Sequence, residues 1–221
     1  IVVKNTINEI LENTFNKTLG ANGEQFLDFG MYIYSAEPNS PFDKAGFKII
    51  DLDFNDINGG SFAITVAKKK SKKHQEISKL VDWLLKKEEV YNYNHPKTFL
   101  NFFENVKKHK LVLRNLLLNL KDMKKKVLGY GASTKGNVIL QYCNIDETLI
   151  PFIAEVNKYK FNKYTPGSKI KIISENDARS LSPDYFLVLP WHFKNFIINK
   201  EKKFLNKNGK LIFPLPDIEI I

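Results

Sequence analysis

Short apolar runs, separated by stretches with helical spacing, recur over the last hundred residues of the chain. The runs predict strands at residues 127–130, 149–154, 170–173, 184–189 and 210–213, and the spacing between them predicts helices at 135–142 and 193–205. The run at 184–189 is almost continuously apolar, which is typical of a strand covered on both faces. Strands that alternate with helices predict a doubly wound, mostly parallel sheet, so the fold class expected for this half is Rossmann-like α/β.

The first part of the chain predicts a partial α/β region that contains a β-hairpin. An amphipathic pattern favours a helix over residues 6–19, and a short helix is expected to end at Gly46. Two alternating runs, 47–54 and 61–67, flank the tight-turn sequence Asn58-Gly59-Gly60. This arrangement predicts an antiparallel hairpin.

Between these two regions lies a segment that is predicted to be mainly helical. Helical spacing covers residues 75–89, and a longer helix is expected to begin at Pro96, because proline suits the first helical turn. Its apolar stripe is short and irregular as a heptad pattern, which favours a core-facing helix over a coiled coil. The expected organisation is therefore a partial or degenerate α/β region at 1–67, a helical linker at 68–125 and a Rossmann-like domain at 126–221.

The composition indicates a globular protein with an excess of positive charge. Of the 221 residues, 43% are hydrophobic and the formal net charge is +10, which makes nucleic acid, a membrane surface or a phosphorylated metabolite conceivable partners. The lysine run at 68–73 lacks the interleaved aromatic residues of a nucleic-acid site. Lysines spread over solvated faces, as a codon-biased genome produces, explain the charge better, so no nucleic-acid partner is expected.

Neither a membrane span nor a disulfide is expected from the sequence. No apolar run approaches the roughly 18 residues that a membrane-spanning helix needs. Cys143 is the single cysteine, and the first residues do not have the pattern of a signal peptide, so a cytoplasmic location is favoured. The first residue is Ile1 rather than methionine, which favours a fragment or a processed product.

The richest local motif lies where the predicted strand at 127–130 gives way to a helix. It comprises Gly129, Tyr130, Gly131, Ala132, Ser133, Thr134, Lys135, Gly136 and Asn137. The glycines permit a sharp turn and close approach of a ligand, the hydroxyl residues suit a helix cap, and the helix N-terminus with its lysine attracts an anion such as a diphosphate. The spacing is not that of a Walker loop, and the third glycine of a dinucleotide fingerprint is displaced by one residue. A tight turn without a ligand is the alternative.

Three further residues follow predicted strands, at the sheet edge where ligands of open α/β folds bind. Glu155 stands where dinucleotide folds place a ribose-binding acid, and the alternative is a surface carboxylate paired with Lys158 or Lys160. Trp191 offers a stacking surface for a base or sugar, with core packing as the alternative. His192 is expected either to cap the following helix or to touch the ligand.

Several of these motifs together resemble a known protein family. They are the stretches 129–137, 154–157, 164–167, 183–191 and 209–216. In this order they resemble the C-terminal domain of SAM-dependent C-methyltransferases that act on nucleotide-linked deoxysugars. The predicted hairpin also resembles the end of that family's central domain, so the resemblance covers about residues 44–221.

The resemblance implies a zinc module, a central SAM-binding domain and a C-terminal domain that helps to hold the nucleotide-sugar. It implies that a base removes the proton beside the sugar's keto group and that the enolate attacks the methyl group of SAM. Cys143 has no cysteine cluster around it, so no metal is expected. The family's glycine-rich SAM loop is not recognisable, and its acid–histidine pair has no counterpart in residues 28–47.

The expected role of this chain is accordingly to supply mainly the sugar-nucleotide-binding domain. A nucleoside-diphosphate sugar is the expected ligand, S-adenosylmethionine the cofactor implied by the family, and a separate SAM-binding subunit a candidate partner. No catalytic residue is assigned. Two alternatives from other classes remain, a noncatalytic binding or assembly module and a dinucleotide-dependent oxidoreductase.

Overall fold

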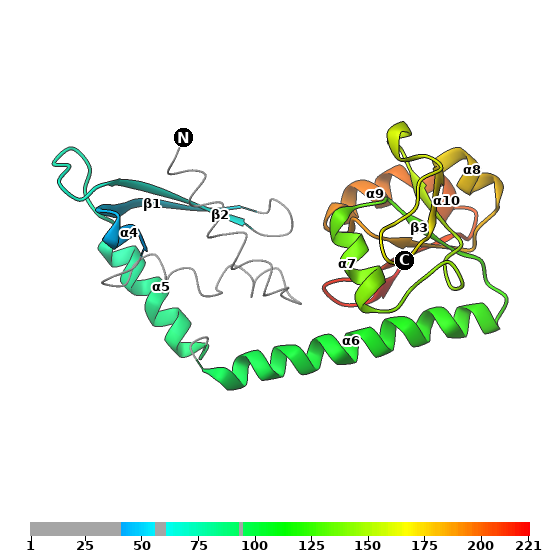
Figure 1. Ribbon diagram of the computed structural model, residues 1–221, viewed down its shortest axis with the longest axis horizontal. Coiled ribbons are helices and arrows are strands. Elements are labelled where there is room, and N and C mark those ends of the chain that lie inside the picture. The colour runs from blue at the N-terminus through cyan, green and yellow to red at the C-terminus, as the bar shows by residue number, and fades with distance from the viewer. Residues whose placement is uncertain (1–40, 56–60, 93–94) are drawn as a thin grey trace. The chain divides into compact units, whose positions relative to one another are not determined.

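The computed structural model describes residues 41–55, 61–92 and 95–221. It contains two compact units that divide between Glu104 and Asn105, within helix α6 (Pro96–Asp122) (Figure 1). The helix expected at 6–19 and the turn expected at 58–60 lie outside the described residues. The three-part division of the chain stays a prediction.

The first unit contains the predicted β-hairpin, which is confirmed. Strand β1 (Phe47–Asn55) pairs antiparallel with β2 (Ser61–Lys68), and α4 (Pro41–Lys44) precedes them. Gly46 joins α4 to β1 with a φ of +78°, the left-handed conformation expected after a helix end.

A β-bulge determines which residues of β1 face the core. Ile49 and Leu52 are both buried, although residues three apart point to opposite faces of a regular strand. The register shifts by one residue between Ile49 and Asp51, and this extra residue returns the two side chains to the same face. They pack against Val81 and Leu84 of α5 (Ser78–Val90), which begins three residues later than the periodicity predicted.

Helix α6 begins at Pro96, as predicted, and its C-terminal half contributes to the core of the second unit. Leu113, Leu117 and Leu120 are buried there, and their spacing of four and three residues places them on one face. Among the helices of the described ranges, none is both long and apolar enough to cross a membrane.

The second unit is built on a six-stranded sheet with the order β5-β4-β3-β6-β7-β8. The strands are β3 (Val127–Tyr130), β4 (Phe152–Glu155), β5 (Lys171–Ser174), β6 (Tyr185–Val188), β7 (Lys210–Phe213) and β8 (Glu219–Ile220). The first five are mutually parallel, and β8 pairs antiparallel with β7 at the edge. The α/β class with a mostly parallel sheet is therefore confirmed.

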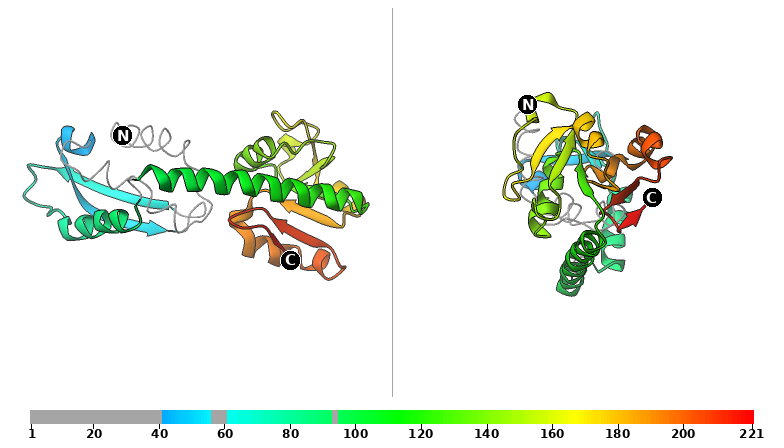
Figure 2. Two further views of the ribbon diagram at one scale, coloured as in Figure 1. Left: turned by 90° about the horizontal axis from the view of Figure 1, so that it is seen from below. Right: turned by 90° about the vertical axis from the view of Figure 1, so that its right-hand side faces the viewer.

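Helices cover both faces of this sheet (Figure 2). They are α7 (Thr134–Tyr142), α8 (Glu175–Ser180), α9 (Lys194–Lys200) and α10 (Lys202–Leu205), with the short 3₁₀ helices η2 (Lys158–Lys160) and η3 (Trp191–Phe193). Val127 packs with α6 and α7, whereas the next residue, Leu128, packs with the helices of the other face. Cys143, at the C-cap of α7, is buried in the first of these two cores.

The single helix predicted over 193–205 is wrong. The chain forms η3, then α9, and breaks again at Glu201 before α10 begins. Glu201 is only 2% exposed, and its carboxylate accepts a hydrogen bond from the Tyr130 hydroxyl and pairs with Arg179. Such a buried acid is not visible in the apolar periodicity, because that pattern treats it as a polar position facing solvent.

Candidate functional site

The strand order reverses direction between β3 and β6, at the centre of the sheet. From β3 the chain passes through α7 to β4 on one side, and from β6 it passes through α9 and α10 to β7 on the other. The two connections pack on opposite faces of the sheet. Ligands of open α/β sheets bind beyond the carboxyl ends of the strands at such a point. The glycine motif and the segment 190–193 both begin there.

The glycine motif forms a tight loop that leads directly into α7. Gly131 has a φ of +79° and donates its N–H to the carbonyl of Ala154 at the end of β4, at 2.8 Å. Ser133 is the N-cap of α7, and its Oγ accepts the N–H of Gly136 at 3.0 Å. The cap expected from the sequence is thus made by Ser133, and Thr134 is the first helical residue.

The other two glycines of the motif allow close packing inside the unit. A β-carbon on Gly129 would lie 2.6 Å from Cγ1 of Ile153, and one on Gly136 would lie 2.5 Å from Cβ of Leu189. The distance at Gly136 shows that α7 packs closely against the end of β6. Gly136 therefore takes the helix–strand packing role of a third fingerprint glycine, despite its displaced position.

Lys135 and His192 bring the two loops of this sheet edge into electrostatic contact. Burial lowers the pKa of Lys135 below its usual value, and burial together with the nearby charge of Lys135 lowers the pKa of His192. Two buried polar atoms of the site, Nδ1 of His192 and Oδ1 of Asn137, have no hydrogen-bond partner within the described part of the chain. Lys135 is therefore close enough to His192 for its positive charge to act on the imidazole, and two polar atoms near this loop are buried without a partner in the described residues.

Of the two roles expected for His192, capping of the next helix is not observed. The N-cap of α9 is Phe193, and no side-chain hydrogen bond is made there. The His192 ring lies edge-on to Trp191, with 5.7 Å between the ring centroids. Trp191 is half-buried and packs against both cores of the unit, as the core-packing alternative expected.

Tyr130 belongs to the glycine motif in sequence, but its side chain lies in the core on the α8–α10 face. Its hydroxyl donates to Oε1 of Glu201 at 2.9 Å, and burial and the charge of Glu201 raise its pKa. Arg179 bridges Glu201 and Glu175, and Lys200 pairs with Glu175 at 2.5 Å. Sequence reasoning missed this network, although the spacing of Glu175 and Arg179 on one helix was a signal for one of its pairs.

Glu155 is buried, and its carboxylate is surrounded by donors. Oε1 accepts the N–H groups of Val156 and Asn157 at 2.8 and 3.0 Å. Oε2 accepts the N–H of Ala132 at 3.1 Å and pairs with Lys160 at 3.1 Å. Burial alone would raise the pKa of Glu155, but the donors from Asn157, Lys160 and Val156 outweigh it and hold the pKa below its usual value. The sequence-based alternative of a pair with Lys160 is thus observed, at a buried position.

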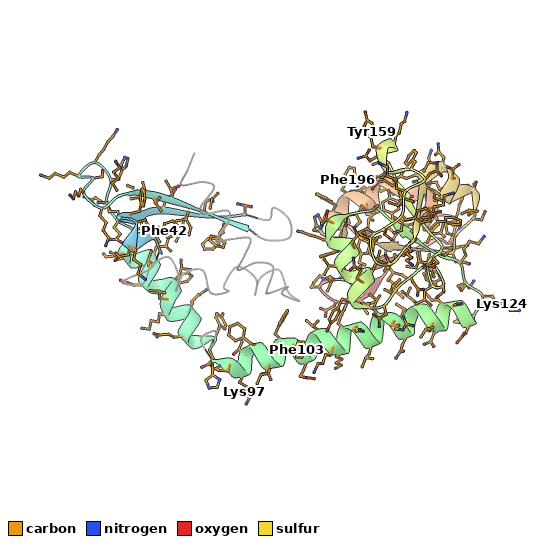
Figure 3. All side chains as sticks on the ribbon, in the orientation of Figure 1. Phe42, Lys97, Phe103, Lys124, Tyr159 and Phe196 are labelled. Atoms are coloured by element: carbon orange, nitrogen blue, oxygen red, sulfur yellow. The ribbon has the colours of Figure 1, made fainter. Side chains whose placement is uncertain are left out.

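Two largely exposed aromatic side chains follow strands at the same edge of the sheet. Tyr159 of η2 is 86% exposed and Phe196 of α9 is 68% exposed (Figure 3). Sequence reasoning did not single them out, because neither belongs to one of the motifs that follow the predicted strands directly. Within the described ranges, no group of three or more histidine, cysteine, aspartate or glutamate side chains is arranged to hold a metal ion.

Comparison with known proteins finds a matching family and a similar curated protein. The family described as "C-methyltransferase C-terminal domain" matches residues 56–216, which include every residue of the candidate site. The C-methyltransferase NovU of Streptomyces niveus is 31% identical over 180 residues, which are 81% of this chain and 42% of NovU. The chain thus spans about two fifths of the length of this curated relative. With more than half of its residues matched, the chain belongs to the C-methyltransferase C-terminal domain family.

Proposed function

We propose that this chain supplies the nucleotide-sugar-binding part of a SAM-dependent C-methyltransferase that acts on a nucleotide-linked keto-deoxysugar. The observation that carries the proposal is the position of the glycine loop and Lys135 at the point where the strand order reverses between β3 and β6. Membership of the C-methyltransferase family supports the reaction class.

The diphosphate of the sugar nucleotide is the group that this loop suits best. The first N–H groups of α7 have no carbonyl within the helix to which they can donate, and the helix dipole adds positive potential at the same end. Lys135 stands in the first turn of α7. A diphosphate placed there receives backbone N–H groups and a full positive charge together.

The remaining residues of the edge are assigned to the sugar and the base. Nδ1 of His192 and Oδ1 of Asn137 are buried without a partner in the described residues, and they would suit the hydroxyl groups of a sugar once these side chains turn toward it. Tyr159 and Phe196 offer exposed aromatic faces for stacking of a base.

S-adenosylmethionine suits the same loop poorly. Its sulfonium and amino groups are positive, whereas the first turn of α7 and Lys135 present positive potential. The ribose of SAM also needs an acidic acceptor, and the carboxylate of Glu155 already accepts four donors. We therefore assign no methyl-transfer step to the described residues, and we propose that SAM is held by another domain or a separate subunit.

Because the loop suits a diphosphate but suits SAM poorly, a second candidate function is a noncatalytic nucleotide-sugar-binding or assembly module. Calorimetric titration of the purified chain with dTDP-glucose and, separately, with SAM tests both functions. Binding of dTDP-glucose but not of SAM would support a chain that binds the nucleotide-sugar alone. If an added SAM-binding subunit then restores methyl transfer, the chain is part of an enzyme, and if it does not, the chain is a noncatalytic module. Failure of dTDP-glucose and UDP-glucose to bind would overturn the proposed function.

A further inference from the structure

We infer that Glu155 and Lys160 form a positioning pair that fixes the glycine loop for diphosphate binding, and that Glu155 is not a ribose ligand. This inference rests on the proposed function for its ligand. Its structural basis is that both polar groups of one loop residue, the N–H and the C=O of Ala132, bond to this single ion pair.

The contacts of Ala132 span a long distance in sequence. Its N–H donates to Oε2 of Glu155 at 3.1 Å, and its carbonyl accepts from Nζ of Lys160 at 2.9 Å. Ala132 lies between Gly131, which has a positive φ, and Ser133, which caps α7. Glycine is the residue whose backbone rotates most freely, so a loop with Gly131 needs an external contact to keep one conformation. The bond from Gly131 to the Ala154 carbonyl is one such contact, and the ion pair adds two more at Ala132, immediately before the first amides of α7.

The carboxylate of Glu155 has no remaining capacity for a ribose. An ionised carboxylate offers about four lone-pair positions. The N–H groups of Val156, Asn157 and Ala132, with the ammonium of Lys160, supply four donors. A ribose hydroxyl would have to displace one of them. Three of these donors are backbone groups that the fold holds in place, so displacement would disturb the loop.

The 3₁₀ helix η2 holds Lys160 in reach of the loop. Asn157 caps this helix by accepting the N–H of Tyr159 at 3.0 Å. Lys160 is the last residue of η2, and its Nζ lies within 3.1 Å of both Oε2 of Glu155 and the carbonyl of Ala132. The side chain of Glu155 is only 8% exposed, so this pair is partly shielded from water, unlike an ordinary surface pair.

The sign of the effect of Glu155→Gln separates positioning from other roles. A carboxylate near an anion repels it, so a role through charge alone predicts tighter binding when the charge is removed. A ribose ligand predicts weaker binding of nucleotides and no change for a ligand without ribose. A positioning residue predicts weaker binding of both ligands, because the loop amides lose their arrangement.

The experiment is calorimetric titration of the full chain with pyrophosphate and with dTDP-glucose. We expect Glu155→Gln to weaken both ligands by about tenfold or more, the scale of one charge-assisted hydrogen bond. Lys160→Met is expected to do the same. Tighter binding of pyrophosphate to Glu155→Gln, or a loss restricted to dTDP-glucose, would overturn the inference.

Lys158→Met is the matched control, because it removes the same charge from the same 3₁₀ helix without touching Ala132. It is expected to leave both affinities within about twofold of the wild type, since exposed charges contribute little. An effect as large as that of Lys160→Met would assign the loss to net charge and contradict positioning. If Glu155→Gln does not fold, Lys160→Met and this control still decide the question.

Amide hydrogen exchange of the ligand-free chain tests the pair independently of the proposed function. Faster exchange at Ala132 in Glu155→Gln, with unchanged exchange in the core strand β6, supports the inference even if no sugar nucleotide binds. Unchanged exchange at Ala132 would overturn it. Failure of the wild-type chain to bind either ligand would instead overturn the proposed function alone.

Discussion

A β-carbon on Gly131 would lie 2.8 Å from both Cγ and Cδ of Pro190. The backbone that leaves β3 and the ring that follows β6 therefore fit together only because residue 131 has no side chain. This contact joins the two loops of the candidate site at the centre of the sheet. The consequence is that the geometry of the site depends directly on packing between two segments about sixty residues apart in sequence.

Gly131→Ala is expected to lower the free energy of unfolding of the second unit by about 1–3 kcal/mol. The φ of +79° is unfavourable for alanine, and the ring of Pro190 cannot move aside as a flexible side chain would. Urea denaturation followed by circular dichroism measures the change. Gly167→Ala is the control, because its φ of +76° is similar but its neighbour is the flexible end of Gln141. Equal losses in the two variants would show that the contact with Pro190 is unimportant.

Lys135→Ala is expected to weaken binding of dTDP-glucose by about 1.5–3 kcal/mol, the scale of a hydrogen bond to a charged group. The reason is the loss of the positive charge in the first turn of α7. Calorimetric titration measures the change in affinity. The control is Lys210→Ala. Lys210 is the first residue of β7, so it lies at the amino ends of the parallel strands, away from the carboxyl ends where the candidate site lies. An unchanged affinity in Lys135→Ala would place the phosphates elsewhere.

The affinity for dTDP-glucose is expected to rise as the pH falls below about 6.5, the ordinary pKa of histidine. Burial and Lys135 lower the pKa of His192, so the free protein holds this imidazole neutral near pH 7. A diphosphate at Lys135 offsets the positive charge that helps to lower the pKa of His192, so the bound state takes up a proton and acid strengthens binding. Titrations between pH 5.5 and 8 test this. His192→Gln should remove the pH dependence, and a wild-type affinity that falls with acidification would contradict the assignment.

Tyr130→Phe is expected to lower the free energy of unfolding by about 1–3 kcal/mol, because it removes a donor from the buried carboxylate of Glu201. The aromatic packing on Phe186 remains in this variant. Thermal denaturation provides the measurement, and Tyr142→Phe at the exposed end of α7 is the control. Stability equal to that of the wild type would mean that Arg179 alone satisfies Glu201.

The sequence predicted the centre of the sheet better than its edges. The runs that became β3, β6 and β7 are apolar at nearly every position, because parallel strands are covered on both faces. The two-residue β8 and the six-residue α8 are too short to establish a period, and neither was predicted. The break at Glu201 depends on contacts with Tyr130 and Arg179, which are distant in sequence.

For the candidate site, the sequence located the glycine loop but not the function of each side chain. Glycines followed by a capping residue predict a loop at a helix N-terminus from local chemistry alone. The environment of Glu155 was not predictable in the same way, because three of its four donors are backbone N–H groups that carry no sequence signal. Tyr130 was assigned to the site because it lies between Gly129 and Gly131 in sequence. The alternation of side chains along β3 instead directs it into the core on the sheet face covered by α8, α9 and α10.

Because Cys143 is buried, the native chain is expected to react only slowly with reagents that label thiols. The side chain is 2% exposed, and burial raises the pKa of the thiol to about 11, with Lys110 opposing the rise. Because the thiolate is the reactive form, the native cysteine reacts slowly with maleimide at neutral pH. A cysteine introduced at the exposed position of Tyr159 would therefore carry a fluorescent label alone, without removal of Cys143.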